Sequence, residues 1–214
     1  MHLNNRLGIS IKGEGEPQIM YPGDKLWSGV TLPQMSIGYE VRLTPLQMLT
    51  LYNAIANDGK MVKPKFAKGL MYHGNWVKTF DTETLKQSIC SRSTLRKVKL
   101  MLEGVVETGT AKNLKNDNYK IAGKTGTAQI ANKESGYADK SKISYQASFA
   151  GYFPADNPKY SCIVVVNAPS RNVYYGNLVA GPVFKEISDK VYASNFEIHE
   201  GLNLAGSLEG EAKV

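Results

Sequence analysis

Apolar residues recur at helical spacing in two stretches of the first half of the chain. The first stretch, residues 44–58, has Thr44 as an N-cap, Pro45 in the first turn and Gly59 beyond its end, which are common start and stop signals of a helix. Its apolar face is wide and we expect it to be largely buried. That face consists of Leu46, Leu49, Ile55 and Ala56, flanked by Met48, Leu51 and Tyr52.

The second stretch runs from residue 91 or 93 to residue 103. Its apolar repeat at Leu95, Val98, Leu102 and Val105 predicts a helix, and the basic residues between them indicate a solvated face. Residues 1–40, in contrast, are rich in glycine and proline and show no sustained period. We therefore expect loops with short elements there.

After residue 118 the hydrophobic period changes to two, which is typical of strands. The predicted strands are 119–130, 144–153 and 160–168. Short connections between them indicate an antiparallel meander. A stripe of Val179, Val183, Ile187 and Val191 predicts a closing helix over 178–194, despite Gly181-Pro182 near its start. The pattern as a whole predicts an α+β domain.

Composition narrows the class of protein. The 214 residues suit one domain or a large part of one, and 42% hydrophobic with 21% charged residues indicates a globular chain. The formal charge of +7 would favour anionic partners, although a mildly basic surface without a partner is the simpler account. No run of lysine and arginine with interleaved aromatic residues occurs, so we expect no nucleic-acid binding.

The cysteines and the apolar runs say little about the compartment. Cys90 and Cys162 form no metal spacing, and Cys162 lies in an apolar run that predicts a buried free thiol. No stretch approaches the roughly 18 apolar residues that span a bilayer, and the first residues lack the apolar core of a signal peptide. We expect either a cytosolic protein or one without its targeting segment.

The sharpest chemical feature is the run Gly123-Lys124-Thr125-Gly126-Thr127-Ala128. A phosphate-binding loop would need a glycine where Asn118 stands and a helix after Thr125, and neither condition is met. On a strand, alternation places Thr125 and Thr127 on one face and Lys124 on the other. Two hydroxyls and an ammonium curling round the strand edge could hold a carboxylate, although an ordinary glycine-containing strand end remains the alternative.

Further motifs accompany this run in a fixed order over residues 1–195. They are Ser36-Ile37-Gly38-Tyr39, Thr44-Pro45-Leu46-Gln47, Asn57-Asp58-Gly59, Lys63-Pro64, Val105-Val106-Glu107-Thr108-Gly109-Thr110-Ala111, Phe149-Ala150-Gly151-Tyr152-Phe153-Pro154, Val164-Val165-Val166, Tyr174-Tyr175-Gly176 and Ala180-Gly181-Pro182-Val183-Phe184. In this order they resemble class B penicillin-binding proteins, and K-T-G belongs to the motif set of those proteins and of class A β-lactamases. The resemblance implies the α+β penicillin-binding protein and β-lactamase-like fold, in part: packed helices and three of its five strands.

The resemblance also implies roles for four residues. Lys124 would bind the substrate carboxylate and support proton transfer, and Thr125 would hydrogen-bond the same carboxylate. Gly126 would leave room for close approach, and the backbone N–H of Thr127 would be one of two oxyanion-hole donors. Lys124 and Thr127 are thus the catalytic candidates, and all four residues are candidates for substrate binding.

The nucleophile of this family is missing from the chain. No serine has a lysine three places on, and the one S-x-N, Ser170-Arg171-Asn172, follows the K-T-G instead of preceding it and is interpreted as chance. His2, His73 and His199 show no spacing for a metal or a triad. We therefore expect residues 1–199 to be the C-terminal portion of a transpeptidase domain, inactive alone, followed by a frayed tail at 200–214.

By resemblance, the parent protein would be a serine D,D-transpeptidase acting on peptidoglycan stem peptides and trapped by β-lactams. It would need no cofactor or metal, work with other cell-wall synthesis proteins at the extracytoplasmic face of the membrane, and reach that membrane only through an N-terminal anchor. Two alternatives stay open: a non-catalytic module that binds D-Ala-ended peptides or a divisome partner, and a β-lactamase or β-lactam sensor. In the family the strand beyond 160–168 comes from the N-terminal part, so we expect that strand to form a sheet edge here.

Overall fold

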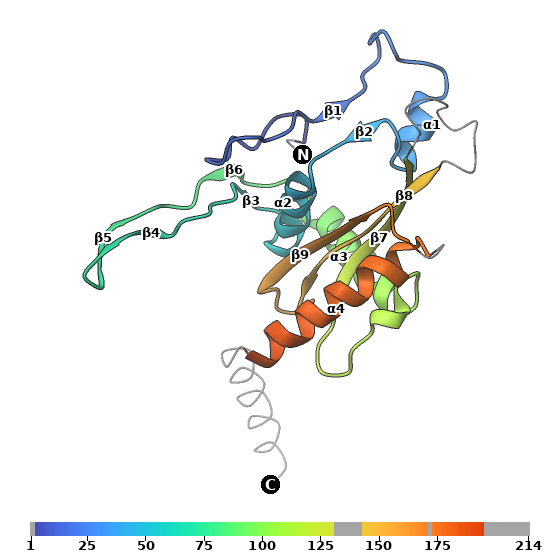
Figure 1. The fold of residues 1–214 in the computed structure, drawn as a ribbon. Coiled ribbons are helices and arrows are strands. Elements are labelled where there is room, and N and C mark those ends of the chain that lie inside the picture. The colour runs from blue at the N-terminus through green and yellow to red at the C-terminus, as the bar shows by residue number, and fades with distance from the viewer. Residues whose placement is uncertain (1–2, 131–142, 171–172, 195–214) are drawn as a thin grey trace.

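The computed structural model describes residues 3–130, 143–170 and 173–194. At its centre is a three-stranded antiparallel sheet with the order β7-β8-β9 (Figure 1). The strands are β7 (Ala122–Ile130), β8 (Ser144–Phe153) and β9 (Tyr160–Asn167). The predicted meander is confirmed, with the first strand starting three residues later than expected. The loop 131–142, the Arg171-Asn172 pair and the tail 200–214 lie outside the described residues.

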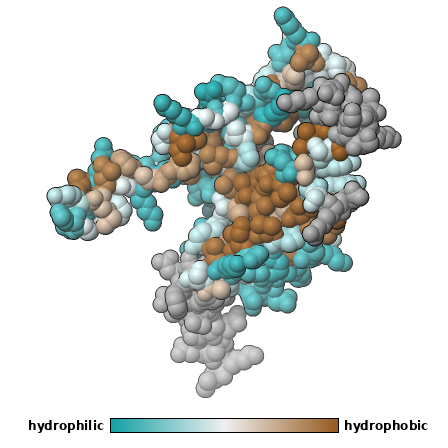
Figure 2. All heavy atoms as spheres, viewed as in Figure 1, coloured by the Kyte–Doolittle hydropathy of each residue, from teal (hydrophilic) through white to brown (hydrophobic). Residues whose placement is uncertain are grey.

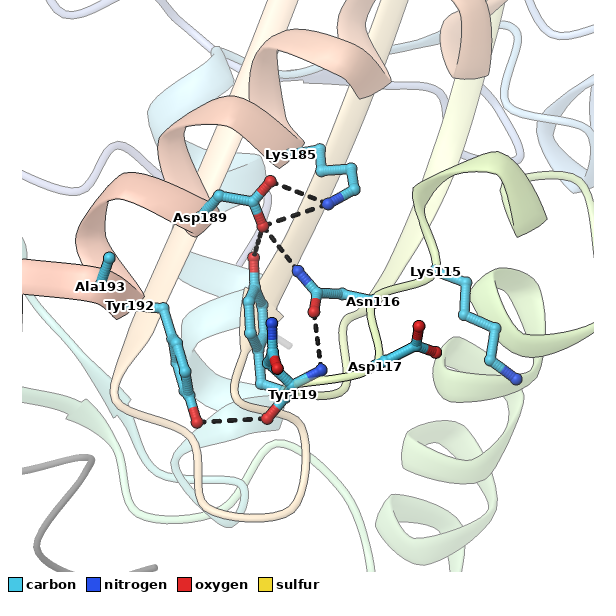
Figure 3. A pocket seen from close by; sticks show the side chains of 9 residues that line it. Lys115, Asn116, Asp117, Tyr119, Lys185, Asp189, Tyr192 and Ala193 are labelled. Atoms are coloured by element: carbon cyan, nitrogen blue, oxygen red, sulfur yellow. Dashed lines mark hydrogen bonds and ion pairs between the residues drawn. The ribbon is translucent and has the colours of Figure 1, made fainter.

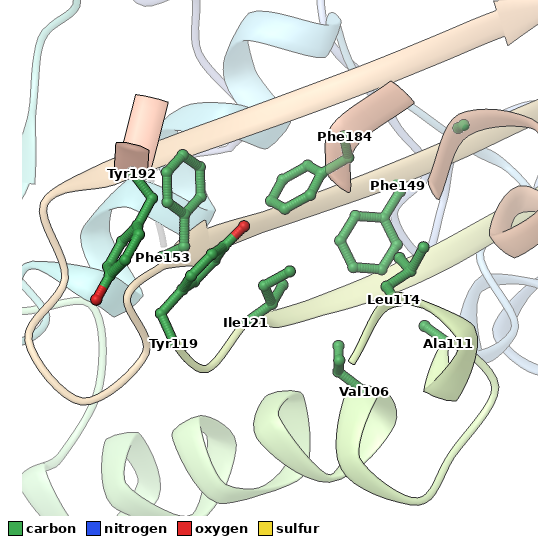
Figure 4. Close-up of a cluster of buried hydrophobic side chains, with 10 residues drawn as sticks. Val106, Ala111, Leu114, Tyr119, Ile121, Phe149, Phe153, Phe184 and Tyr192 are labelled. Atoms are coloured by element: carbon green, nitrogen blue, oxygen red, sulfur yellow. The ribbon is translucent and has the colours of Figure 1, made fainter. Parts of the chain in front are cut away.

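Helices pack on both faces of this sheet because its side chains alternate between two cores. Phe149 and Phe153 point toward α4 (Gly176–Ser194) and form one core, shown in Figure 4. Ala122 and Tyr152 point the other way, toward α2 (Pro45–Ala56) and α3 (Arg92–Glu107), and form the second core. The period of two in the sequence therefore corresponds to two buried faces.

The cap predicted for α2 is confirmed and is more complete than expected. The Thr44 hydroxyl accepts a hydrogen bond from the Gln47 N–H at 3.1 Å, and the Gln47 side chain accepts one from the Thr44 N–H at 2.9 Å. This reciprocal capping box satisfies two N–H groups at the helix start. The predicted apolar face is only partly right, because Leu46 and Leu49 are half-buried whereas Gln47 and Thr50 are buried.

The other two long helices extend beyond their predicted bounds. The helix α3 starts after the N-cap Ser91 and continues to Glu107 instead of residue 103. Val106, in the added turn, is buried in the same core as residues of α4. The closing helix begins at Gly176, two residues earlier than predicted, and contains Pro182 in its interior. None of the helices in the described ranges is long and apolar enough to cross a membrane.

Short ribbons surround this central part, as expected for the irregular first residues but not for residues 61–86. The described chain has three two-stranded antiparallel ribbons and two short helices outside the central sheet. They lie before α2, between α2 and α3, and between α3 and β7. They are β1 (Gln18–Ile19) with β2 (Val41–Arg42), β3 (Met61–Val62) with β6 (Thr84–Lys86), β4 (Gly69–Tyr72) with β5 (Asn75–Thr79), α1 (Thr31–Ser36) and η1 (Lys112–Leu114). The β4–β5 ribbon projects away from the sheet as an arm (Figure 1).

The strand β9 is an edge of the sheet, as predicted. Within the described ranges it pairs with β8 alone, so its outer edge is unpaired. Its side chains are mostly half-buried, since α2 and α4 both pack near it. Figure 2 shows a hydrophobic patch in the middle of the molecule, in the region where Figure 1 places β9.

Candidate active site

The K-T-G triplet lies inside β7, so the strand hypothesis is confirmed and the phosphate loop is excluded. Lys124, Thr125 and Gly126 pair with Ala150, Phe149 and Ser148 of β8, and no helix begins at Thr125.

The two threonine side chains lie on the face of the sheet that carries α4. The Thr125 hydroxyl lies 3.2 Å from the Thr110 hydroxyl, which belongs to the loop after α3. The Thr127 hydroxyl accepts a hydrogen bond of 3.1 Å from the Gly176 N–H at the start of α4. Both side chains are thus held by neighbours that lie far away in the sequence.

The side chain of Lys124 is exposed. Its ammonium donates to the Thr125 carbonyl at 2.9 Å and lies 3.3 Å from the Thr125 hydroxyl. The side chain therefore bends back along its own strand and reaches the residue whose side chain points to the other face. An ammonium and a hydroxyl in this arrangement offer two adjacent donors to a carboxylate.

The outer edge of β7 is open. In the described ranges this strand pairs with β8 alone. Two hydrogen bonds between its backbone and nearby side chains show which backbone groups point away from β8. The Thr125 carbonyl accepts from Lys124, and the Gln129 N–H donates to the Tyr39 hydroxyl at 3.4 Å. Because backbone groups change edge with each residue of an antiparallel strand, the Thr127 N–H faces the same edge between them.

Two glycines allow the strand to fit between its neighbours. A Cβ on Gly126 would meet the Ser148 side chain, so part of the reason for this glycine is packing against β8. On the opposite face, a Cβ on Gly176 would lie 2.6 Å from the Gly126 carbonyl oxygen and would also meet the Ser148 carbonyl. The start of α4 therefore lies directly on the K-T-G backbone. Any residue larger than glycine at position 176 would prevent this close approach.

Sequence reasoning gave no individual role to several residues that surround the strand. Tyr39, Thr110 and Gly176 each contact β7, and Tyr145 stacks on Tyr174 with ring centroids 3.9 Å apart. The signal was present, because all of them except Tyr145 lie in the motifs that accompany K-T-G. What the sequence could not show was that these motifs converge on one strand.

A separate polar pocket lies at the other end of α4 (Figure 3). It has a volume of about 410 Å³ and surrounds Asp189, which is bound by Lys185 at 2.8 Å and by Tyr119 and Asn116 at 2.7 Å each. Asp189 lies 13 residues along α4 from Gly176, which is roughly 20 Å in a helix. Because its carboxylate is already paired, this network joins α4 to the sheet and leaves β7 as the candidate site.

Neither cysteine nor acidic clusters add a second candidate. Cys90 and Cys162 are free and half-buried, and burial raises the pKa of the Cys162 thiol. The described parts of the chain hold no group of three or more histidine, cysteine or acidic side chains that could bind a metal.

Comparison with known proteins agrees with the fold and with the order of motifs. Residues 2–189 match the family described as penicillin binding protein transpeptidase domain. Stage V sporulation protein D of Bacillus subtilis is 30% identical over 189 residues, which cover 85% of this chain and 27% of that protein. Penicillin-binding protein PbpB of Mycobacterium tuberculosis is 34% identical, over 79% of this chain and 25% of that protein.

Solved structures similar to this chain also include penicillin-binding proteins. The apo crystal structure of penicillin-binding protein 3 from Mycobacterium tuberculosis has a TM-score of 0.76 and 31% identity, covering 89% of this chain and 44% of that chain. The aztreonam complex of that protein has a TM-score of 0.75 at the same identity, covering 89% of this chain and 43% of that chain. This chain spans 27% and 25% of the length of the two curated relatives named above. Because the family match covers residues 2–189, the chain belongs to the penicillin-binding protein transpeptidase domain family.

Proposed function

We propose that this chain is the C-terminal part of the catalytic domain of a peptidoglycan D,D-transpeptidase, and that β7 is the strand that binds the substrate. The observation that carries this proposal is the open edge of β7, where the Lys124 ammonium, the Thr125 hydroxyl and the outward N–H of Thr127 follow one another. A relative in Pseudomonas aeruginosa, 30% identical, is named a probable peptidoglycan D,D-transpeptidase.

The reaction of such an enzyme is an acyl transfer in two steps. A serine hydroxyl attacks the penultimate D-Ala carbonyl of a stem peptide, the terminal D-Ala leaves with a proton, and an acyl-enzyme ester remains. An amine of a neighbouring stem then attacks the ester, and the serine regains its proton. A β-lactam resembles the donor peptide and would stop at the ester, since its leaving group stays tethered.

The residues of β7 would serve this reaction in three ways. Lys124 and Thr125 would hold the carboxylate of the donor, because both present donors to the same outer edge. The Thr127 N–H would donate to the oxygen of the tetrahedral intermediate, where the negative charge develops. Gly126 would keep the strand slim enough for the peptide to lie along it. Lys124 would further support proton transfer at the serine of an S-x-N motif outside this chain.

The chain alone should be inactive, because acylation also needs a nucleophile and its base. No S-x-x-K occurs in its sequence, and the second oxyanion donor would be the nucleophile's own N–H. The complete protein would act at the extracytoplasmic face of the membrane with other cell-wall synthesis proteins. The same missing motif is what favours the second candidate, a module that binds D-Ala-ended peptides without chemistry.

Intact-mass spectrometry with a penicillin tests the proposal on two versions of the protein. The first is the 214-residue chain, which should form no covalent adduct. The second adds the upstream region encoded in the genome, and should gain the mass of one penicillin. In that longer version Lys124→Ala should slow acylation at least about a hundredfold, as expected when a transition-state donor is removed.

A matched control separates this role from loss of charge or fold. Lys120 is also exposed and lies four residues before Lys124, so Lys120→Ala should leave the acylation rate within about twofold. An adduct on the 214-residue chain would show that it holds its own nucleophile, and Ser170 would be examined first. A longer version that binds the peptide but is never acylated would favour the binding module instead.

A further inference from the structure

The β4–β5 arm is the least covered part of the described chain. All of its residues from Leu70 to Thr79 are exposed, and the ribbon extends away from the sheet and its helices (Figure 1). A two-stranded ribbon is marginal by itself, because it has no third layer against which to bury side chains. Even so, it carries five large apolar side chains that are each more than half exposed: Leu70, Met71, Tyr72, Trp76 and Val77.

These side chains occupy both faces of the ribbon. Met71 pairs with Trp76 on one face, and Tyr72, the next residue of β4, points to the other face. The register shifts between Leu70 and Met71, so the pairing is irregular toward the base of the ribbon. A site for one flat partner surface would need only one apolar face. Figure 2 shows brown and tan atoms along the visible side of the arm. An occupant that could cover both faces at once must surround the arm.

The charged residues within the arm and its base are all basic, and the nearest acidic residues are Asp58, Asp81 and Glu83 on either side of this stretch. Residues 59–80 contain no aspartate or glutamate and contain Lys60, Lys63, Lys65, Lys68 and Lys78. Of these, Lys63 is paired with Glu83, at 3.0 Å, whereas Lys68 and Lys78 lie at or near the base of the ribbon. The Lys78 ammonium lies 5.7 Å from the centre of the Phe80 ring, within the range of a cation–π interaction at the base of the ribbon.

From these observations we propose that the β4–β5 arm binds the surface of an anionic lipid bilayer, with its tip at the boundary between headgroups and acyl chains. Tryptophan and tyrosine prefer this boundary, and lysine side chains extend from it to lipid phosphates. Four ribbon residues at about 3.3 Å each span roughly 13 Å, which is enough to reach it. The contact is additional to any N-terminal membrane anchor of the complete protein.

A bilayer fits the arm better than an anionic polymer or an acidic protein surface. A polymer would pair with the lysines but would leave both apolar faces in water, and a flat protein surface would cover one face. Lipid covers both faces and matches the charge at the same time. The polar turn His73-Gly74-Asn75 limits the depth, since its backbone groups need hydrogen bonds from headgroups or water.

Tryptophan fluorescence tests the proposal directly, because the chain has two tryptophans and one is on the arm. In the 214-residue chain carrying Trp27→Phe, Trp76 is the single reporter. We expect its emission to shift to the blue with vesicles that contain phosphatidylglycerol, and to be quenched when the lipids carry bromine on their acyl chains. Vesicles of pure phosphatidylcholine should bind at least about tenfold more weakly.

Paired variants separate the arm from the overall charge. Lys68→Gln with Lys78→Gln should weaken binding roughly 25-fold, since each lysine near an anionic surface contributes about fivefold. Arg96→Gln with Lys97→Gln removes the same charge from the exposed side of α3 and should change binding less than about threefold. Met71→Ser with Val77→Ser should abolish the blue shift, whereas Leu100→Ser with Met101→Ser, an exposed pair on α3, should not.

Three results would overturn the proposal. The first is equal loss of binding in both charge variants, which would indicate adsorption through net charge. The second is binding without quenching by brominated lipid, which would leave Trp76 in water. The third is shielding of Trp76 from iodide in the longer version of the protein before any lipid is added, which would show that the same chain covers the arm. Each result is independent of acylation, so it does not depend on the proposed activity.

Discussion

The central sheet and the β4–β5 arm are built from the same antiparallel pairing, yet their side chains have opposite fates. In β8, Phe149 and Tyr152 have no exposed surface, because helices pack on both faces of the sheet. In the arm, Trp76 is 54% exposed and Tyr72 is 69% exposed. Hydrogen-bonded pairing therefore does not decide burial, and the third layer does.

The difference is also visible in what each region requires of its glycines. At the junction of the sheet with α4, Gly176 has no room for a Cβ, whereas a Cβ on Gly74 in the turn of the arm would meet nothing within 4 Å. Gly74 is instead required by its φ of 81°, which suits the tight turn that also holds His73 at a φ of 47°. Packing therefore constrains Gly176, whereas backbone conformation constrains Gly74 in the turn of the arm.

The largest contrast between the two regions is expected from truncating one aromatic residue in each. Phe149→Ala should lower the free energy of unfolding by about 3–5 kcal/mol, because it leaves a cavity between the sheet and α4. Trp76→Ala should change it by less than about 0.5 kcal/mol. Urea unfolding followed by circular dichroism measures both values. Similar losses would mean that the arm packs against the domain in solution.

Two glycine substitutions should act in opposite directions. Gly176→Ala should destabilise the protein by about 1–3 kcal/mol, since the new Cβ would push α4 away from the backbone of Gly126. Gly104→Ala lies inside α3 with no neighbour within 4 Å, and should stabilise the protein by about 0.5–1 kcal/mol through the unfolded state. Thermal unfolding of the two variants gives the signs, and a neutral Gly176→Ala would contradict the close approach of α4.

Two buried tyrosines in the central part sharpen the comparison further. The Tyr119 hydroxyl lies 2.7 Å from both Ser188 and Asp189, so Tyr119→Phe should cost about 1 kcal/mol. The Tyr152 hydroxyl has no hydrogen-bond partner among the described residues, so Tyr152→Phe should be neutral or slightly stabilising. Burial raises the pKa of both phenols. Equal effects of the two substitutions in urea unfolding would contradict this assignment.

The smallest expected effect is the pH dependence from Asp189. Partial burial raises its pKa, but hydrogen bonds from Lys185 and Tyr119 outweigh burial and hold the pKa below the ordinary value of about 3.9. Its contribution should thus be fully present well above pH 4 and be lost as the pH falls through the lower folded pKa. We expect at most about 1 kcal/mol, because the side chain is 42% exposed.

Unfolding of the parent chain and of Asp189→Asn between pH 2 and pH 7 measures this contribution. The difference between the two chains should be largest near neutral pH and shrink in acid. A difference that grows as the pH falls would show that the folded pKa is raised instead.

The sequence alone determined the elements whose side chains are buried in a regular pattern. The period of two gave β8 at its true bounds, and the Thr44 cap gave the start of α2, because local hydrogen bonds and alternation are written in adjacent residues. The position of Lys124 and Thr125 on a strand was likewise available, since residues after Thr125 alternate and do not form a helix. The motif order was enough to indicate the family.

Only the tertiary structure decided which distant residues meet. It brought Thr110 to Thr125 and Gly176 to Thr127, and it showed that a Cβ on Gly126 would meet the Ser148 side chain. It also revealed the arm, whose short strands carry apolar residues on both faces and so lack the alternation that marks a half-buried strand. The physical reason is the same in each case: contacts between residues far apart in sequence depend on how the layers pack, and no local pattern encodes that packing.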